Sequence, residues 1–322
     1  MRTTVSMALV CAPVLLAIGV PCRAELDVIL YPAYGTGTAA VVEGRVIDRE
    51  KQGEITAEDG RARNLSRNLR SLMNDEQEDV PVTVTIGEKA WRTTTNQEGY
   101  FRILIEDLTL PMPGWHEMSA ATTDGSGKGS LLLVPAHNVH GLISDFDDTV
   151  VISEVNDKSQ LLANSLLLNY RQRKPVPDVA AAYGKLAATN PDTTSAPLFY
   201  LSASPRQLQS SIQAFLDHNN FPRGVLITKR VTNDASSEPL TNQFAYKLGR
   251  LVEVFERLPH VSFVLAGDDG EQDPEIYAAM QRRYPTRVTA IWIRRVHPDP
   301  ARVRIEGQGD LAELLVPIVS SP

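Results

Sequence analysis

Cysteine is almost absent from this 322-residue sequence, which contains only Cys11 and Cys22, both within its first 24 residues. Residues 25–322 therefore form no disulfide bond among themselves and offer no thiolate ligand to a metal ion. A cysteine nucleophile is excluded from them for the same reason. Any catalysis in this part of the chain must use oxygen or nitrogen groups.

Positive charge is also in short supply. The chain has 32 lysines and arginines against 39 aspartates and glutamates, a formal net charge of −7, and residues 1–24 hold two of the arginines and none of the acids. This acidic balance argues against nucleic acid as the main partner. No apolar run after residue 24 is long enough to cross a membrane, so no spanning segment is predicted there.

Residues 1–24 have the features of a targeting segment. Arg2 supplies an early positive charge, the apolar stretch from Met7 to Val20 is short for a bilayer, and the segment ends with a small residue at Ala24. We therefore predict a signal peptide cleaved after Ala24 and an exported protein, periplasmic or secreted. An uncleaved membrane anchor is the alternative interpretation.

Residues 25–136 are rich in short β-branched or alternating runs separated by turn residues, which is typical of β-strands. Strands are predicted at Leu26–Leu30, Val41–Ile47, Val80–Ile86, Tyr100–Ile105 and Leu131–Val134. Asn96–Gly99 is predicted to be a hairpin turn, and residues 62–73 a helix. A small β-sandwich is the simplest arrangement of these elements.

Residues 137–322 have a different pattern, in which apolar strands alternate with amphipathic helices. Strands are predicted at Gly141–Ser144, Leu198–Ser202, Val225–Thr228, Ser262–Ala266 and Val288–Ile293, and helices at 177–188, 206–218, 243–257 and 274–283. The alternation predicts an α/β domain with a doubly wound parallel sheet, whose site lies at the carboxyl ends of the strands. We place the boundary between the two domains near Pro135.

Three carboxylates follow the first of these strands directly, at Asp145, Asp147 and Asp148. So much negative charge at a strand end is costly unless a cation neutralises it, and oxygen ligands of this kind suit Mg²⁺. A carboxylate is also a nucleophile for phosphoryl groups, and a second acid can protonate the leaving oxygen and then deprotonate water. Taken alone, the motif has an acidic helix cap or a calcium loop as its alternative.

Three further features follow in the order that a phosphoryl-transfer enzyme needs. Ser202 ends a strand with a hydroxyl donor, Lys247 is suited to neutralising a phosphoryl group, and Asp268 begins a run of acids after another apolar strand. Singly, these features have structural alternatives, because Ser204 is placed to cap the next helix and a lone lysine on a helix is usually solvated. The ordered set favours an enzyme site.

The same residues resemble the haloacid-dehalogenase superfamily, and within it the actin-patch-associated phosphatidate phosphatase family. The motifs that carry the resemblance are Ile143–Thr149 (ISDFDDT), Phe199–Pro205 (FYLSASP), Lys247 followed by Pro259, and Gly267–Tyr277 (GDDGEQDPEIY). The last motif is highly specific, and the resemblance covers nearly all of the chain after residue 24. The chain departs from the family at Val151, Arg206 and Asp269, where a lysine, an aromatic residue and a serine are usual.

The resemblance implies a Mg²⁺-dependent phosphatase with a haloacid-dehalogenase-like fold. Asp145 resembles the nucleophile, and Asp147 the general acid/base, whose backbone carbonyl also binds the metal. Thr149 would steady the loop, Ser202 would bind phosphate, and Lys247 would neutralise charge. The implied metal ligands are Asp145, Asp147 and Asp268, with the second acid after the last strand left open between Asp269 and Asp273.

By resemblance, the leading substrate is phosphatidate or a related lipid phosphate. A predicted helix at Leu161–Lys174, which ends in cations, and the apolar segment Leu108–Trp115 would suit contact with a lipid or a membrane surface. A core helix and a packed β-sandwich loop are the favoured interpretations of these two segments. A phosphatase of a soluble phosphomonoester is the alternative enzyme. The alternative of another class is a non-catalytic envelope-binding protein with a retained phosphatase fold.

Overall fold

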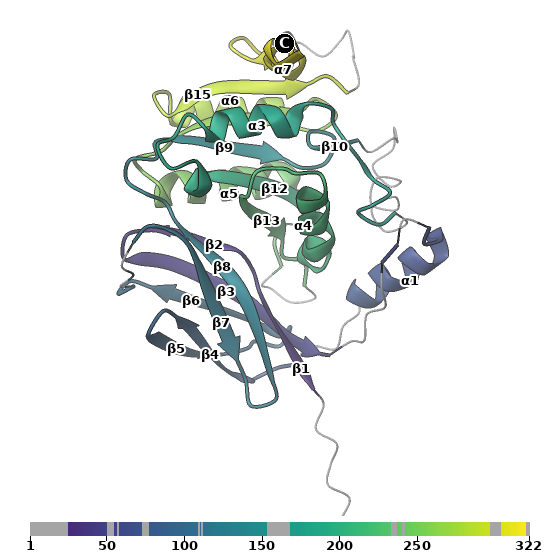
Figure 1. Cartoon of the computed structure of the whole chain (residues 1–322), viewed down its shortest axis with the longest axis vertical. Coiled ribbons are helices and arrows are strands. Elements are labelled where there is room, and N and C mark those ends of the chain that lie inside the picture. The colour runs from purple at the N-terminus through teal and green to yellow at the C-terminus, as the bar shows by residue number, and fades with distance from the viewer. Residues whose placement is uncertain are drawn as a thin grey trace, which may run out of the picture.

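The computed structural model describes residues 25–49, 55–56, 58–72, 77–108, 110, 112–152, 168–232, 237–239, 242–296 and 304–319, and for 67–72 and 316–319 the backbone alone. The predicted signal peptide lies outside these residues. Within them, none of the helices is both long and apolar enough to cross a membrane. The described chain is a mixed α/β structure built on two main sheets, one above the other in Figure 1.

The strands between residues 26 and 133 hydrogen-bond into one sheet, called the β-rich sheet below. Their bounds are β1 Leu26–Leu30, β2 Ala33–Thr36, β3 Ala39–Asp48, β4 Pro81–Ile86, β5 Lys89–Thr94, β6 Tyr100–Ile105, β7 Gly114–Ala121 and β8 Gly125–Leu133. The order is β1-β3-β2-β8-β7-β4-β5, with β6 beside β3; most neighbours are antiparallel, and β8 runs parallel to β1 and β2. The five predicted strands are confirmed, and the two-layer sandwich stays a prediction.

The pattern of buried hydrophobic side chains explains why some strands, such as β4, were predicted from the sequence and others, such as β5, were not. On β4, Val82, Val84 and Ile86 are buried in the core of the β-rich sheet, and the residues between them face outward. On β5 the burial also alternates, but Ala90, Arg92 and Thr94 are exposed and Trp91 is its one large apolar side chain. Pairing with β4 therefore places β5 in the sheet, without a hydrophobic pattern of its own.

The turn predicted at Asn96–Gly99 is present, but it is not a hairpin. The Gly99 N–H donates to the Asn96 carbonyl oxygen at 2.9 Å, and Gly99 has a φ of 72° that favours glycine. The strands on either side of the turn pair elsewhere, β5 with β4 and β6 with β3. The helix predicted at 62–73 is confirmed as α1 (Arg61–Leu72).

Six strands between residues 140 and 310 form a second sheet, called the parallel sheet below. They are β9 His140–Asp145, β12 Leu198–Pro205, β13 Val225–Lys229, β14 Ser262–Asp268, β15 Val288–Arg294 and β16 Gly309–Asp310. Their order is β13-β12-β9-β14-β15-β16, and all neighbouring strands pair in parallel. All carboxyl ends therefore lie along one edge, and all five strands predicted from the sequence are confirmed.

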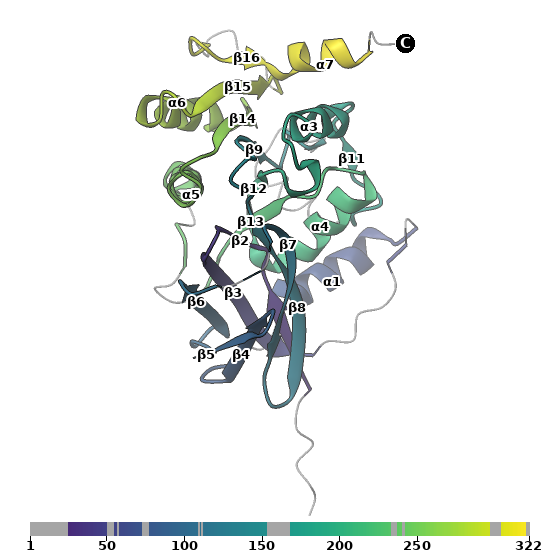
Figure 2. The same cartoon turned by 60° about the vertical axis from the view of Figure 1, so that its left-hand side comes forward.

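Helices cover both faces of the parallel sheet, as Figure 2 shows. Their bounds are α3 Val179–Ala187, α4 Gln209–His218, α5 Gln243–Arg257, α6 Asp273–Arg283 and α7 Leu311–Val319. Buried side chains of α5 and α6 share one hydrophobic cluster with the sheet, and those of α3, α4 and α7 share another. The four predicted helices are confirmed, and α7 is an additional one.

The helix predicted at Leu161–Lys174 falls partly outside the described residues, which resume at 168. From residue 168 on, the predicted helix is wrong. The Gln172 N–H donates to the Asn169 carbonyl oxygen at 3.0 Å in a turn. Lys174 belongs to a short strand, β11 (Lys174–Pro175), which pairs with β10 (Val151–Ile152). The following proline disfavours helical backbone at Lys174. The Asn169 side chain also accepts from the Arg171 N–H at 3.0 Å, which stabilises a turn.

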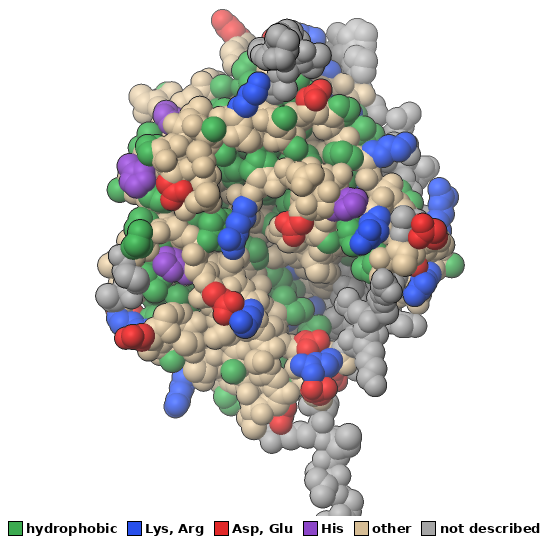
Figure 3. All heavy atoms as spheres, in the orientation of Figure 1, with side chains coloured by type: hydrophobic (Ala, Val, Ile, Leu, Met, Phe, Trp, Pro, Cys, Tyr) green, Lys and Arg blue, Asp and Glu red, His purple; other side chains and the backbone are tan. Residues whose placement is uncertain are grey.

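The two sheets share part of one core. Tyr34 and Leu132 of the β-rich sheet belong to the same buried cluster as α5 and α6. In the segment Leu108–Trp115, Leu108 is buried and Trp115 donates to the Thr194 carbonyl oxygen at 3.1 Å, while Met112 is exposed. Figure 3 shows acidic and basic side chains interspersed over one face of the described residues. Division into independently folding domains near residue 136 stays a prediction.

Candidate active site

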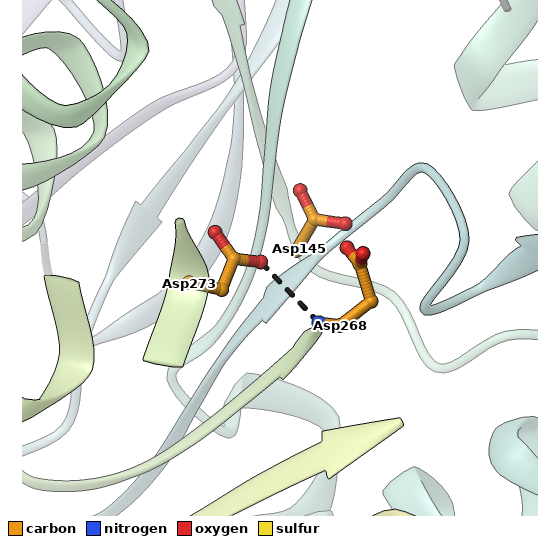
Figure 4. A group of neighbouring side chains, drawn as sticks. All are labelled: Asp145, Asp268 and Asp273. Carbon is orange, nitrogen blue, oxygen red and sulfur yellow. Dashed lines mark hydrogen bonds between the residues drawn. The ribbon is translucent and has the colours of Figure 1, made fainter. Parts of the chain in front are cut away.

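Three buried carboxyl groups meet at the carboxyl edge of the parallel sheet. Asp145 ends β9, Asp268 ends the neighbouring strand β14, and Asp273 begins α6. One oxygen of each lies within 4.8 Å of the others, and Figure 4 shows the three groups gathered together. The chain order of the strands reverses between β9 and β14, which is where parallel sheets of this kind open a crevice for ligands.

Gly267 allows Asp273 to approach the strand. A Cβ at this position would lie 2.5 Å from the Asp273 carboxylate and 2.7 Å from the Tyr277 ring, so any larger residue would push α6 away. The Asp268 N–H donates to Asp273 Oδ2 at 3.4 Å, which ties the strand end to the first turn of the helix. An acid at a helix amino terminus is also favoured by the helix dipole.

Asp145, Asp268 and Asp273 are called the acidic trio below. Lys247 is the buried cation that lies among them. From α5, its Nζ lies 2.7 Å from Asp145 Oδ1 and 2.6 Å from Asp273 Oδ1, and only 1% of its side chain is exposed. Burial alone would lower the pKa of Lys247, but the two carboxylates hold it well above its usual value. The alternative of a solvated lysine is therefore wrong.

The acidic trio has more negative charge than Lys247 offsets. Burial raises the pKa of Asp145 well above its usual value; Lys247 lowers it, and the carboxylates of Asp273 and Asp268 raise it again. The pKa values of Asp268 and Asp273 are raised too, with burial as the first cause. Among the described residues, Asp145 Oδ2 and Asp268 Oδ2 have no hydrogen-bond partner. Buried, unpartnered carboxylate oxygens fit a divalent cation.

Asp147 lies beside the trio rather than in it. Its Oδ2 accepts hydrogen bonds from Ser202 Oγ at 3.2 Å and Ser204 Oγ at 3.4 Å, and its Oδ1 pairs with Arg173 at 3.2 Å. Ser204 does not cap the next helix, as the sequence alternative had it, because no side-chain cap is formed there. Ser202 is fully buried on β12, which pairs with β9, the strand that precedes Asp147.

The segment after Asp145 is a tight turn. Phe146 carbonyl oxygen accepts from the N–H groups of both Val150 and Val151, and Asp148 has a φ of 58°. Thr149 is buried inside the turn, and its hydroxyl has no partner among the described residues. This geometry brings Asp147 back toward the strand end that carries Asp145.

The sequence left open whether Asp269 or Asp273 is the second metal ligand, and the structure places these two acids in different surroundings. Asp273 belongs to the acidic trio, whereas Asp269 is turned away from it. Asp269 Oδ1 accepts the Val296 N–H at 2.7 Å, and its Oδ2 lies 3.6 Å from Arg295. Adjacent residues at a strand end point in opposite directions, so Asp268 and Asp269 do not share one site.

Arg173, which pairs with Asp147, was not predicted as a site residue; from the sequence it counted only among the cations that end the helix predicted at Leu161–Lys174. Its guanidinium carbon lies 5.3 Å from the centre of the Phe146 ring and 5.8 Å from that of Phe215, and its side chain is 9% exposed while paired with Asp147. Glu271, 3.5 Å from Lys247, was missed as well. Both arrive through loops, where no periodic signal marks them.

Known proteins resemble this chain over its second half. Residues 140–295 match the family described as phosphatidate phosphatase APP1, catalytic domain. Phosphatidate phosphatase APP1 of Saccharomyces cerevisiae is 28% identical over 154 residues, which are 48% of this chain and 25% of that protein. An uncharacterized protein of Schizosaccharomyces pombe is 28% identical over 220 residues, 65% of this chain and 35% of that protein.

The likeness is limited in extent. The chain spans about a quarter to a third of the length of these two curated relatives. Among solved structures, the IG27 protein domain aligns with 35% of this chain and 97% of its own, at 12% identity and a TM-score of 0.22, which is too low to carry an argument. The motifs and the match over residues 140–295 together make this part of the chain similar to the phosphatidate phosphatase APP1 catalytic domain.

Proposed function

We propose that this chain is an exported, Mg²⁺-dependent phosphatase that hydrolyses a phosphomonoester through an aspartyl-phosphate on Asp145. The observation that carries the proposal is the acidic trio around Lys247, with unpartnered carboxylate oxygens at the carboxyl edge of the parallel sheet. A structural ion pair needs only one acid for one cation. The excess buried negative charge of three acids is instead typical of a site that also binds a metal ion.

Asp145 and Asp268 are the side chains that would hold the metal ion, together with the backbone carbonyl of Asp147. Mg²⁺ bound there would offset negative charge on the acids and on the phosphoryl group. Asp273 is bound to Lys247 at 2.6 Å and would orient that cation. Asp269 is paired with Arg295 and Val296 and takes no part in this assignment.

The reaction would proceed in two steps. In the first, the Asp145 carboxylate attacks phosphorus, the ester P–O bond breaks, and Asp147 gives its proton to the departing alcohol oxygen. In the second, Asp147 takes a proton from water, the water oxygen attacks phosphorus, and inorganic phosphate leaves a regenerated Asp145. Ser202 and Lys247 would donate hydrogen bonds to phosphoryl oxygens in both steps.

The strand order supports the finer fold assignment. Numbered along the chain, the first five strands of the parallel sheet lie in the order 3-2-1-4-5, with helices on both faces, which is the arrangement of a doubly wound fold. We propose that it is of the haloacid-dehalogenase type, with the β-rich sheet as a small sandwich domain in front of it.

Phosphatidate or a related lipid phosphate is the substrate class that we propose. The yeast relative is named for phosphatidate, and Arg173 stands beside Asp147 where it can meet an anionic head group. Export is proposed from residues 1–24 alone. A soluble phosphomonoester is the alternative substrate class.

Release of inorganic phosphate from phosphatidate in vesicles tests this function. With Mg²⁺, the wild type should release phosphate, and Asp145→Asn or removal of Mg²⁺ with a chelator should stop it. Preference for water-soluble esters would move the substrate to the alternative class. A wild type and an Asp145→Asn variant that are equally inert across lipid and soluble esters would contradict the enzyme and favour a binding protein.

A further inference from the structure

A buried ion pair joins the β-rich sheet to the segment that follows Ser202. Glu43 lies on β3, and its carboxylate pairs with the guanidinium of Arg206, which begins a short 3-10 helix directly after β12. Only 18% of the Glu43 side chain and 5% of the Arg206 side chain are exposed. Arg206 also donates from Nε to the Thr228 carbonyl oxygen at 3.4 Å and lies 4.7 Å from the centre of the Tyr31 ring.

Arg206 lies close in the chain to Ser202, the serine proposed to bind phosphate. Three residues separate Arg206 from Ser202, and the N–H of one of them, Ser204, donates to Ser202 Oγ at 3.0 Å. Pairing of β12 with β13 is irregular over the same stretch, between Leu201 and Pro205. With the strand pairing interrupted there, Arg206 is an anchor for the segment.

The same glutamate also acts on the helix that carries Lys247. Arg250 lies one turn further along α5 and binds Glu253 at 2.8 Å. Burial would raise the pKa of Glu43, but the positive charges of Arg206 and Arg250 hold it below its usual value. Glu43 is therefore a carboxylate at neutral pH and pairs with Arg206, while Arg250, which pairs with Glu238 at 2.7 Å, adds to the positive charge that acts on Glu43.

The two segments are also bound to each other. Tyr246, next to Lys247 on α5, donates its hydroxyl hydrogen to the Ser202 carbonyl oxygen at 3.0 Å. A shift of either segment is therefore transmitted to the other. Figure 1 shows β3 below α5 and β12, on the side of the β-rich sheet.

We propose that Glu43 is a positioning residue of the catalytic centre, which holds the segments bearing Ser202 and Lys247 in place from the neighbouring sheet. The inference rests on the proposed phosphatase function and assigns the β-rich sheet a part in it. Loss of the carboxylate would leave Arg206 buried without its partner, and a small displacement of groups that contact the phosphoryl moiety lowers the rate steeply.

Glu43→Gln tests the proposal because it removes the charge and keeps the shape. Its matched control is Glu117→Gln, which breaks an exposed pair with Lys128 on the same sheet. Ile86→Val, a small cavity in the core of that sheet, controls for lost stability alone. Turnover is measured per folded molecule on vesicle-borne phosphatidate and, in parallel, on p-nitrophenyl phosphate.

Glu43→Gln should lower kcat/KM about ten- to a hundredfold, with a raised KM as well as a lower kcat. Both controls should keep the wild-type KM, because partial unfolding lowers the active fraction without changing substrate binding. The Glu43→Gln, Arg206→Gln double variant should be no slower than the slower of the two single variants, since both remove one interaction. Additive losses, or a wild-type KM in Glu43→Gln, would overturn the proposal.

Hydrogen exchange separates this proposal from the phosphatase function. In Glu43→Gln, amides of 202–209 and 245–251 should exchange faster than in the wild type, and they should be unchanged in Glu117→Gln. If the wild type releases no phosphate but this pattern holds, the enzyme assignment fails and the positioning contact stands. If the wild type is active and exchange in Glu43→Gln matches the control, the positioning role is wrong.

Discussion

The two sheets differ in where they bury charged side chains. In the described residues of 25–133 these are Arg45 and Asp59; in those of 140–319 they are Asp145, Arg206, Lys229, Lys247, Asp268, Asp269 and Asp273. The strands explain the difference, because β4 alternates between buried and outward positions, whereas β9 is buried at every residue after its first. A strand covered on both faces has only its end for polar groups, so a parallel sheet concentrates them at one edge.

Substitution of the proposed nucleophile should give the largest difference in activity between a variant of the parallel sheet and a variant of the β-rich sheet. Asp145→Asn should lower phosphatase activity by about four to six orders of magnitude, because an amide does not attack phosphorus. Ile86→Val in the β-rich sheet should leave kcat unchanged. Phosphate release by both variants, with circular dichroism as the check of folding, measures the contrast. Residual activity in Asp145→Asn near that of Ile86→Val would assign the chemistry elsewhere.

Removal of a lysine should have unequal effects on stability in the two sheets. Lys247→Met leaves Asp145 and Asp273 without their buried cation and should cost about 3–5 kcal/mol of unfolding free energy. Lys128→Met breaks a pair whose side chains are 72% and 66% exposed and should cost less than about 0.5 kcal/mol. Urea unfolding of both variants tests this, and similar midpoints would contradict the described burial of Lys247.

Magnesium should stabilise the parallel sheet through the acidic trio. At a hundredfold excess over its dissociation constant, Mg²⁺ should add about 2.7 kcal/mol to the stability of the metal-free protein. Asp268→Asn should lose most of this gain, and Ile86→Val should keep it. Thermal unfolding with and without Mg²⁺ is the measurement. An equal response in all three proteins would place the metal away from the trio.

Acid should weaken the contact between the sheets. The pKa of Glu43 is held below its usual value of 4.5 in the folded protein, although burial opposes this, because Arg206, Arg250 and Arg230 face it. Its stabilising effect is therefore complete above pH 4.5 and is lost as the pH falls through the lower folded-state value. Arg102, 3.7 Å from Glu43, acts in the same direction.

This pH effect is the smallest of the four and requires a difference measurement. The loss of thermal stability between pH 5 and about pH 3 should be smaller in Glu43→Gln than in the wild type, because the amide does not titrate. Glu117→Gln should follow the wild-type curve. Identical curves for Glu43→Gln and the wild type would show that the ion pair adds nothing to the pH dependence.

Much of the parallel sheet was predictable because the hydrophobic residues of its strands and helices follow clear sequence patterns. Its long strands and four of its helices follow from apolar runs and amphipathic spacing, and the acids appear directly at strand ends. Predictions failed where local chemistry was decisive. A turn at Asn169 and a proline at 175 end the expected helix, and the turn at Asn96–Gly99 joins strands that find other partners.

The sequence alone determined the α/β alternation, the order of the site residues and the resemblance of the second half to a phosphatase family. Only the tertiary structure decided that Asp273 rather than Asp269 joins Asp145, that Arg173 pairs with Asp147, and that Glu43 meets Arg206. Each of these is a contact between distant segments, set by register, by the direction of a side chain at a strand end and by packing of one sheet on another. Local spacing along the chain holds no record of such contacts.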